Sequence, residues 1–138
     1  MVSNICNDWI QSAHSDFIVI ESIYTMVQNP RHRPHEQVLY HCQQAVEKML
    51  KAYLYNNNLQ PWGHNLNLLR SECSKIDSAF NTKRISDHCA FLHAYNTARY
   101  PDYSDVIDAS IASRGINSAK RVYDFVSERL GLGKMFFV

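Results

Sequence analysis

The chain has 138 residues, of which 46% are apolar and 20% charged, a size and composition typical of one globular domain and not of a disordered or fibrous chain. Four glycines and four prolines are too few for the many tight turns of a β-sandwich, and a formal net charge of +1 lacks the global basic excess of many nucleic-acid-binding proteins. No apolar stretch approaches the roughly 20 residues of a membrane span. No basic region followed by an apolar segment opens the chain, so we expect a cytoplasmic protein without membrane contact.

The first predicted helix is amphipathic and begins near residue 4. Ser3 or Asn4 is a suitable N-cap, and Asn29, Pro30 and Pro34 predict a loop at about 29–34 because proline lacks a backbone donor and disfavours helix in the residue before it. Steps of three and four place the apolar residues of this helix on one face: Trp9, Ala13, Phe17, Ile20, Tyr24 and Val27.

The second predicted helix has the clearest pattern in the chain. Pro34 is suited to its first position, and Ala45 and Ala52, seven residues apart, allow close approach of a neighbouring helix. Three asparagines at 56–58, followed by Pro61 and Gly63, predict its end and a loop. Its apolar residues fall within an arc of about 100°, a typical core-facing stripe: Leu39, Cys42, Val46, Met49, Leu50 and Tyr53.

Three further helices are predicted with weaker patterns. Leu66 to Ile76 suggests a short helix, and Asn81 or Thr82 caps another that must stop near Tyr100, since Pro101 follows. The last runs from Ile116 to Leu130 with Gly131 as its C-terminal cap, and its extension back to residue 106 stays open because Gly115 costs about 1 kcal/mol in a helix interior. We therefore predict an all-α, antiparallel up-and-down bundle of four to five helices in one domain, residues 1–138.

Polar residues gather on one side of the second helix. His41, Gln44, Lys48 and Lys51 fall within an arc of about 80° on the helical wheel, and Gln43 and Glu47 continue this side. Ammonium, imidazole and amide groups suit phosphate and base or sugar edges. The alternative is a solvated face with a Glu47–Lys51 pair at helical spacing.

Metal, thiol and hydrolase sites find little support in the sequence. The four cysteines are widely separated, which favours reduced thiols in or near the core, and the seven histidines are spread over loops and helix faces. No Gly-rich phosphate loop, Gly-x-Ser-x-Gly elbow or His-Glu-x-x-His motif is present. We expect no metal ion and no cofactor.

The second helix also resembles a known family. The run from His35 to Leu54, with Gln43-Gln44-Ala45 before Glu47-Lys48-x-Leu50-Lys51-Ala52, resembles the second helix of HEPN domains, the helical domains named for nucleotide binding in higher eukaryotes and prokaryotes. Other pieces match in order across most of the chain: Trp9, Ala13 and Asp16 on the first helix, Gly63-His64-x-Leu66 before the third, and Arg99-Tyr100-Pro101-Asp102 after the fourth.

The resemblance implies a bundle of about five helices, usually paired as a homodimer, with a polar groove that contacts nucleotide or RNA. In short prokaryotic members the partner is often a minimal nucleotidyltransferase, and some such pairs act as toxin and antitoxin. Nuclease members carry an Arg and a His separated by four to six residues. Here Arg31 and His35 are separated by three residues and so are Arg84 and His88, whereas Arg33 and His41 are separated by seven. No catalytic residue is therefore assigned, and an enzyme is not the favoured interpretation.

Two further groups complete the predicted site. Arg99 precedes a proline-fixed turn and suits phosphate binding, unless it pairs with Asp102. Tyr100 suits either stacking on a base or packing in the protein. His64 suits either contact with a phosphate or hydrogen bonding at the start of a helix. The leading hypothesis is a binding module for nucleotide, RNA or a nucleotidyltransferase. Alternatives are a divergent metal-independent endoribonuclease using Arg99 and His41, and a structural subunit. The predicted binding residues are His41, Gln44, Lys48, Lys51, His64, Arg99, Tyr100 and Asp102.

Overall fold

The computed structural model describes residues 1–95 and 107–138. The regular elements in these ranges are helices joined by loops, and no strand is among them. This confirms the predicted all-α fold. The elements in chain order are α1 (Asn4–Met26), η1 (Pro30–His32), α2 (His35–Asn56), α3 (Leu66–Ser74), η2 (Ser78–Asn81), α4 (Lys83–Ala94) and α5 (Ala109–Arg129).

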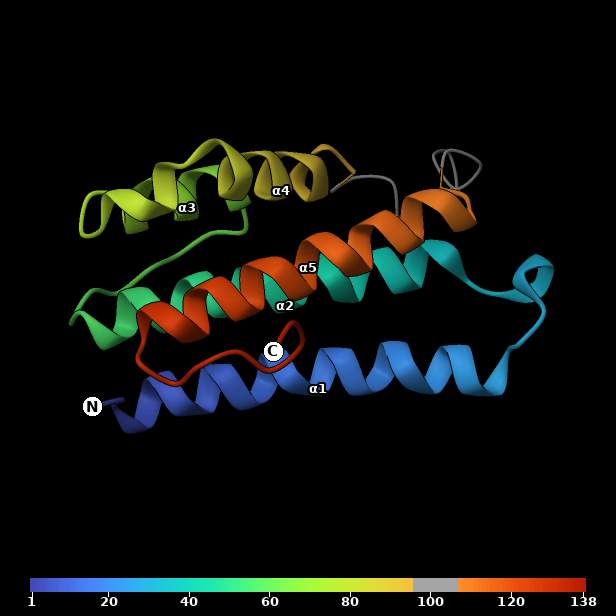
Figure 1. The fold of residues 1–138 in the computed structure, drawn as a ribbon, viewed down its shortest axis with the longest axis horizontal. Helices are drawn as coiled ribbons and strands as arrows, with labels where there is room; N and C mark the ends of the chain where they lie inside the picture. Colours follow the sequence, from blue (N-terminus) through green and yellow to red (C-terminus); the bar gives the residue numbers. More distant parts are fainter. Residues whose placement is uncertain (96–106) are drawn as a thin grey trace.

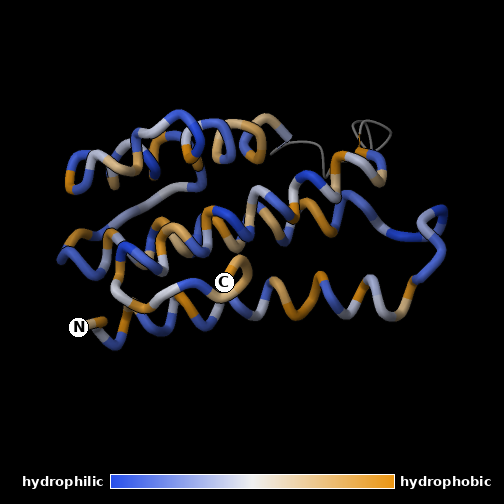
Figure 2. Tube along the Cα trace, viewed as in Figure 1, coloured by the Kyte–Doolittle hydropathy of each residue, from blue (hydrophilic) through white to orange (hydrophobic). Residues whose placement is uncertain are grey.

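Helix α2 is the central element of the bundle, since it packs against α1, α3, α4 and α5. In Figure 1, α1 and α4 run in one direction, and α2 and α5 run in the other. Apolar and polar residues alternate along the helices (Figure 2), so each helix presents a stripe to the core. All six residues of the predicted α2 stripe are buried, and Ala45 and Ala52 are fully buried, as close approach of neighbouring helices requires.

The helix ends confirm several predictions and correct others. Ser3 caps α1 by accepting from Cys6 N, and Thr82 is the N-cap of α4. Pro34 is the N-cap of α2 and lies one residue before the predicted position. The predicted end of α4 near Tyr100 is wrong: the helix ends at Ala94 with Tyr95 as its C-cap. Asparagine and threonine, which follow at 96 and 97, have low helix propensity.

Both ends of α5 are fixed by specific hydrogen bonds. The helix extends back to Ala109, where the side chain of Asp108 accepts from Ile111 N. After Arg129, Gly131 has φ 80° and its N–H donates to Glu128 O. The next N–H, of Leu132, donates to Ser127 O, which completes a Schellman motif and confirms the predicted glycine cap.

Gly115 lies inside α5 because α2 approaches it closely. A Cβ at this position would clash with Leu39 Cδ1, and Leu39 is itself 2% exposed. Helix propensity alone disfavours glycine at this position, whereas the missing side chain makes room for a core leucine.

Gly115→Ala is expected to lower the free energy of unfolding by about 1 kcal/mol, because the cost of overpacking, about 1–3 kcal/mol, exceeds the gain of about 1 kcal/mol in helix propensity. Urea unfolding followed by circular dichroism measures the change. Ser113→Ala, at an exposed position on the same helix, is the control and should not destabilise the protein. Equal or higher stability of Gly115→Ala would show that Leu39 moves aside without cost.

No helix within the described ranges is long and apolar enough to cross a lipid bilayer.

Candidate functional site

A buried carboxylate on α1 holds an imidazole and an ammonium group of α2. Asp16 is 5% exposed, and its Oδ2 accepts from Lys48 Nζ at 2.8 Å. Its Oδ1 lies 2.8 Å from His41 Nδ1. Because a carboxylate only accepts, this nitrogen of His41 donates and the Nε2 atom is left for another partner. The group therefore fixes the orientation of His41 and Lys48 on α2.

A second carboxylate lies on α2 itself. Glu47 Oε2 accepts from Lys51 Nζ at 2.9 Å, the pair that the sequence spacing offered as the alternative to phosphate binding. His64 Nδ1 lies 3.1 Å from both oxygens of the same carboxylate. Side-chain exposure is 8% for Glu47 and 9% for Lys51 but 76% for His64, so the imidazole covers a buried ion pair.

Two aromatic rings continue this site toward the N-terminus. Lys51 Nζ lies 5.6 Å from the centroid of the Trp9 ring, a cation–π distance. Trp9 stacks in turn on Tyr55 with centroids 5.6 Å apart and ring planes at 18°. Lys51 is thus held between a carboxylate and an indole, and its charge is already compensated.

The adjacent glutamines Gln43 and Gln44 of α2 differ in their surroundings. Gln43 is 5% exposed, and its Nε2 donates to Leu92 O at 2.8 Å, which ties α2 to the end of α4. Gln44 is half-buried, and within residues 1–95 and 107–138 its amide forms no hydrogen bond. Gln43 is therefore structural, whereas the Gln44 amide has hydrogen-bonding capacity for a ligand.

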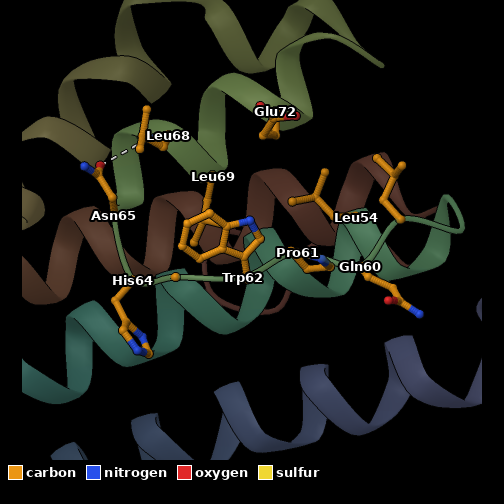
Figure 3. A pocket seen from close by; sticks show the side chains of 11 residues that line it. Leu54, Gln60, Pro61, Trp62, His64, Asn65, Leu68, Leu69 and Glu72 are labelled. Atoms are coloured by element: carbon orange, nitrogen blue, oxygen red, sulfur yellow. Dashed lines mark hydrogen bonds between the residues drawn. The ribbon is translucent and has the colours of Figure 1, made fainter.

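A pocket of about 520 Å³ lies next to His64, between the 57–65 segment and α3. Figure 3 shows Trp62 at its opening in front of Leu69. Leu54 and Leu69 are buried, whereas Trp62 is 88% exposed. A volume of this size, with apolar walls and one exposed indole, is typical of a small-molecule site. The other lining residues are Leu59, Gln60, Pro61, Gly63, His64, Asn65, Leu68 and Glu72.

Gly63 connects the pocket to the carboxylate pairs. Its φ of 86° lies in the left-handed region, which other residues adopt only with strain. Figure 3 shows Trp62 and His64 pointing to opposite sides of the chain at this turn. Both residues line the pocket, and His64 also reaches the carboxylate of Glu47.

The structure places five of the predicted site residues in two groups and one single position. His41 and Lys48 share the carboxylate of Asp16, and Lys51 and His64 share that of Glu47. Gln44 lies on α2 and belongs to neither group. The other three, Arg99, Tyr100 and Asp102, lie outside the described residues. The sequence pointed to Asp16 only as a match to the HEPN pattern, not as a binding residue, and gave no role to Trp62. Asp16 was detectable as a carboxylate inside the apolar stripe of α1, between Ala13 and Phe17, but Trp62 in its loop had no periodic signal.

The cysteines offer no activated thiolate. All four are buried and unpaired by disulfide. Burial raises the pKa of Cys6 to about 11 and those of Cys42 and Cys89 to about 12, and it also raises the pKa of Cys73. In the parts of the chain that the structure covers, no three His, Cys, Asp or Glu side chains form a group able to hold a metal ion. The chemistry on offer is that of imidazole, ammonium and carboxylate groups.

Comparison with known proteins agrees with this architecture. The structure resembles that of TT1696 from Thermus thermophilus with a TM-score of 0.78, over 92% of this chain and 99% of that chain, at 18% sequence identity. This likeness shows a shared fold. No curated protein matches the chain significantly. The sequence profile of the HEPN domain matches residues 6–130. The chain therefore belongs to the HEPN domain family.

Proposed function

We propose that the protein is a HEPN-type binding module for a nucleotide or RNA. Family membership supports a nucleotide- or RNA-related module in general terms. The observation that supports this site is the position of His64, which lies at the pocket of Trp62 and on the carboxylate that holds Lys51. In this proposal a base stacks on Trp62, and His64 meets the sugar or phosphate.

The ion pairs define which groups are available to such a ligand. Lys51 is compensated and buried, so it contributes shape and not free charge. Lys48 is 21% exposed, and it shares Asp16 with His41. The Nε2 atom of His64, whose Nδ1 contacts Glu47, and the amide of Gln44 are the groups that a ligand meets without breaking an internal contact.

Purine nucleotides and short RNA are expected to quench Trp62 fluorescence saturably in a Trp9→Phe variant, because Trp62 is then the one indole in the chain. Adding His64→Ala should weaken binding roughly tenfold, the effect of one charge-assisted hydrogen bond. His32→Ala, on the exposed η1, is the matched control. Absence of saturable quenching by every nucleotide and RNA would reject the proposal.

We also propose that the protein forms a homodimer and works with a minimal nucleotidyltransferase, as a toxin–antitoxin or other regulatory pair. Exposed apolar side chains on α1 support a protein interface: Ile18 is 51% exposed and Met26 82%. Purification with and without a nucleotidyltransferase encoded beside this gene tests both contacts. A stable complex that is indifferent to changes at Lys48 and His64, together with no nucleotide binding, would favour a purely structural subunit.

A second candidate function is metal-independent RNA cleavage. It is favoured by the Asp16–His41 contact, which leaves the Nε2 atom of a half-buried imidazole for acid or base chemistry beside Lys48. The same RNA samples incubated with chelator report cleavage directly. Cleavage that disappears in His41→Gln would replace the binding-module proposal, and intact RNA would reject this second function.

A further inference from the structure

Positive charge is concentrated in the C-terminal helices. The described residues from Lys83 onward contain seven lysines and arginines and four aspartates and glutamates, whereas residues 1–82 contain six and seven. Lys83 pairs with Asp87, and Arg129 pairs with Asp77. The excess therefore belongs to the remaining cationic side chains of α4, α5 and the segment after α5.

Four of these cations lie along the contact between α4 and α5 or where it ends, and the two helices run antiparallel (Figure 1). The guanidinium of Arg114 lies over Phe91, with its Cζ 4.1 Å from the ring centroid. One turn further along α5, Ser118 Oγ lies 2.9 Å from His88 Nδ1. A further turn along, Arg121 and Arg84 border one small hollow together with Lys134. We call this line the basic seam, and its residues are Arg84, His88, Arg114, Arg121 and Lys134.

Aromatic rings, and not carboxylates, hold two of the guanidinium groups. Arg121 lies over Phe137 with its Cζ 3.5 Å from the ring centroid, as Arg114 lies over Phe91. Across the described ranges, none of the four lysines and arginines of the basic seam forms an ion pair. Their charge is therefore available to a ligand.

The acidic groups near the basic seam are few and largely engaged. Asp124 accepts the backbone N–H groups of Met135, Phe136 and Phe137, and Asp87 accepts from Lys83. Glu128, at the hollow, is exposed. The positive charges of the basic seam also act on His88. Burial lowers the pKa of His88, and Arg84, Arg121 and Arg114 lower it further, whereas Asp87 raises it.

We propose that the basic seam binds the phosphodiester backbone of single-stranded nucleic acid. Arg114 and Arg121 are two helical turns apart, about 10 Å along the axis, so they reach successive groups of a polymer better than one small anion. Guanidinium groups match phosphate geometry. Phe91 of α4 and Tyr95, the C-cap of that helix, supply aromatic surface beside the cations. Proteins that bind single-stranded nucleic acid combine cations with aromatic rings in this way, whereas binding of an acidic peptide does not require the rings.

This surface is separate from the pocket at Trp62, because the two share no residue. The inference therefore does not depend on mononucleotide binding. The inference holds if the protein binds oligonucleotides through the basic seam, whether or not the pocket at Trp62 also binds a ligand.

The test uses fluorescence anisotropy with labelled oligo-U and oligo-dT of about 15 nucleotides, the upper range of a single-strand site. Arg114→Gln/Arg121→Gln is compared with Lys75→Gln/Lys83→Gln, which removes the same charge from ion-paired lysines. We expect the arginine variant to lose at least tenfold in affinity and to reduce the salt slope by about 1.4, two phosphates at about 0.7 each. The lysine variant should retain wild-type binding, because it leaves every residue of the basic seam in place.

Circular dichroism confirms that the variants fold, and Arg114→Lys, which keeps the charge, should retain most of the affinity if folding is intact. Three outcomes would overturn the inference. These are no oligonucleotide binding by the wild-type protein, equal losses in the arginine and lysine variants, or displacement of the oligonucleotide by poly-glutamate at equal charge concentration, which would identify an acidic protein as the partner.

Discussion

Glu47→Gln is expected to lower the free energy of unfolding by about 3–5 kcal/mol, because it leaves the buried ammonium of Lys51 without its carboxylate. Glutamine preserves the size of the side chain and removes the charge, so the loss reports the ion pair and not a cavity. Chemical denaturation at neutral pH measures it. Glu72→Gln, which removes a carboxylate from an exposed pair with Lys75, should change stability by less than about 1 kcal/mol.

The same site allows a sharper control. Removing both charges with Glu47→Gln/Lys51→Met is expected to recover much of the loss, since a buried pair replaced by uncharged groups is often neutral in stability. A double variant as unstable as Glu47→Gln would mean that the carboxylate acts mainly through His64. That result would shift the function of this group from holding α2 to holding the 57–65 segment.

Asp124→Asn is expected to release the segment after α5 and to lower the free energy of unfolding by about 3 kcal/mol. The buried carboxylate accepts three backbone N–H groups, from Met135, Phe136 and Phe137, and hydrogen bonds to a charged group contribute about 1.5–3 kcal/mol each. Asparagine has one acceptor oxygen and cannot receive all three donors. Limited proteolysis should cut at Lys134 or Phe136 before the core in this variant.

Glu128→Gln, at an exposed position one turn along α5, is the control and should leave the protease pattern unchanged. Phe136 packs on Phe17 and Tyr123, so its release should also expose an aromatic cluster between α1 and α5. If the segment stays protected in Asp124→Asn, these ring contacts and not the carboxylate hold it. Phe136→Ala would then give the phenotype expected here for Asp124→Asn.

Local signals in the sequence predicted the helices well. The α2 stripe follows helical spacing, Ser3 suits an N-cap, and Gly131 suits a C-terminal cap, and each depends on residues within a few positions of one another. The prediction for the end of α4 was wrong because its signal set only an upper limit. Pro101 marked the last position that a helix can reach, whereas the actual end at Ala94 lies before it.

The site was predictable only in part because its groups come from distant segments. Helical spacing placed His41, Lys48 and Lys51 on one face and paired Lys51 with Glu47, yet it did not show that α1 supplies Asp16 to two of them. The polar face, for which the sequence left ligand binding and a solvated surface open, has three buried members, Gln43, Glu47 and Lys51. Burial of Lys51 follows from the position of α2 among four other helices, which no local pattern encodes.

The basic seam, too, could not be predicted from local sequence patterns alone. Arg84 and His88 are four residues apart, and Arg114 and Arg121 are seven apart, so each helix presents its cations on one face. Those two faces were visible separately in the sequence. That they meet along one line depends on the antiparallel packing of α4 and α5, which only the structure supplies.

The contact between Phe136 and Phe17 forms late while the chain is being synthesised. It joins residues that are far apart in the sequence, whereas α1 and α2 are consecutive helices joined by a short loop. The hairpin of α1 and α2 can therefore form on the ribosome while the residues around Phe136 are still in the exit tunnel. Until they emerge, the aromatic surface of Phe17 faces water, and this nascent state is the stage at which a chaperone has an apolar surface to bind.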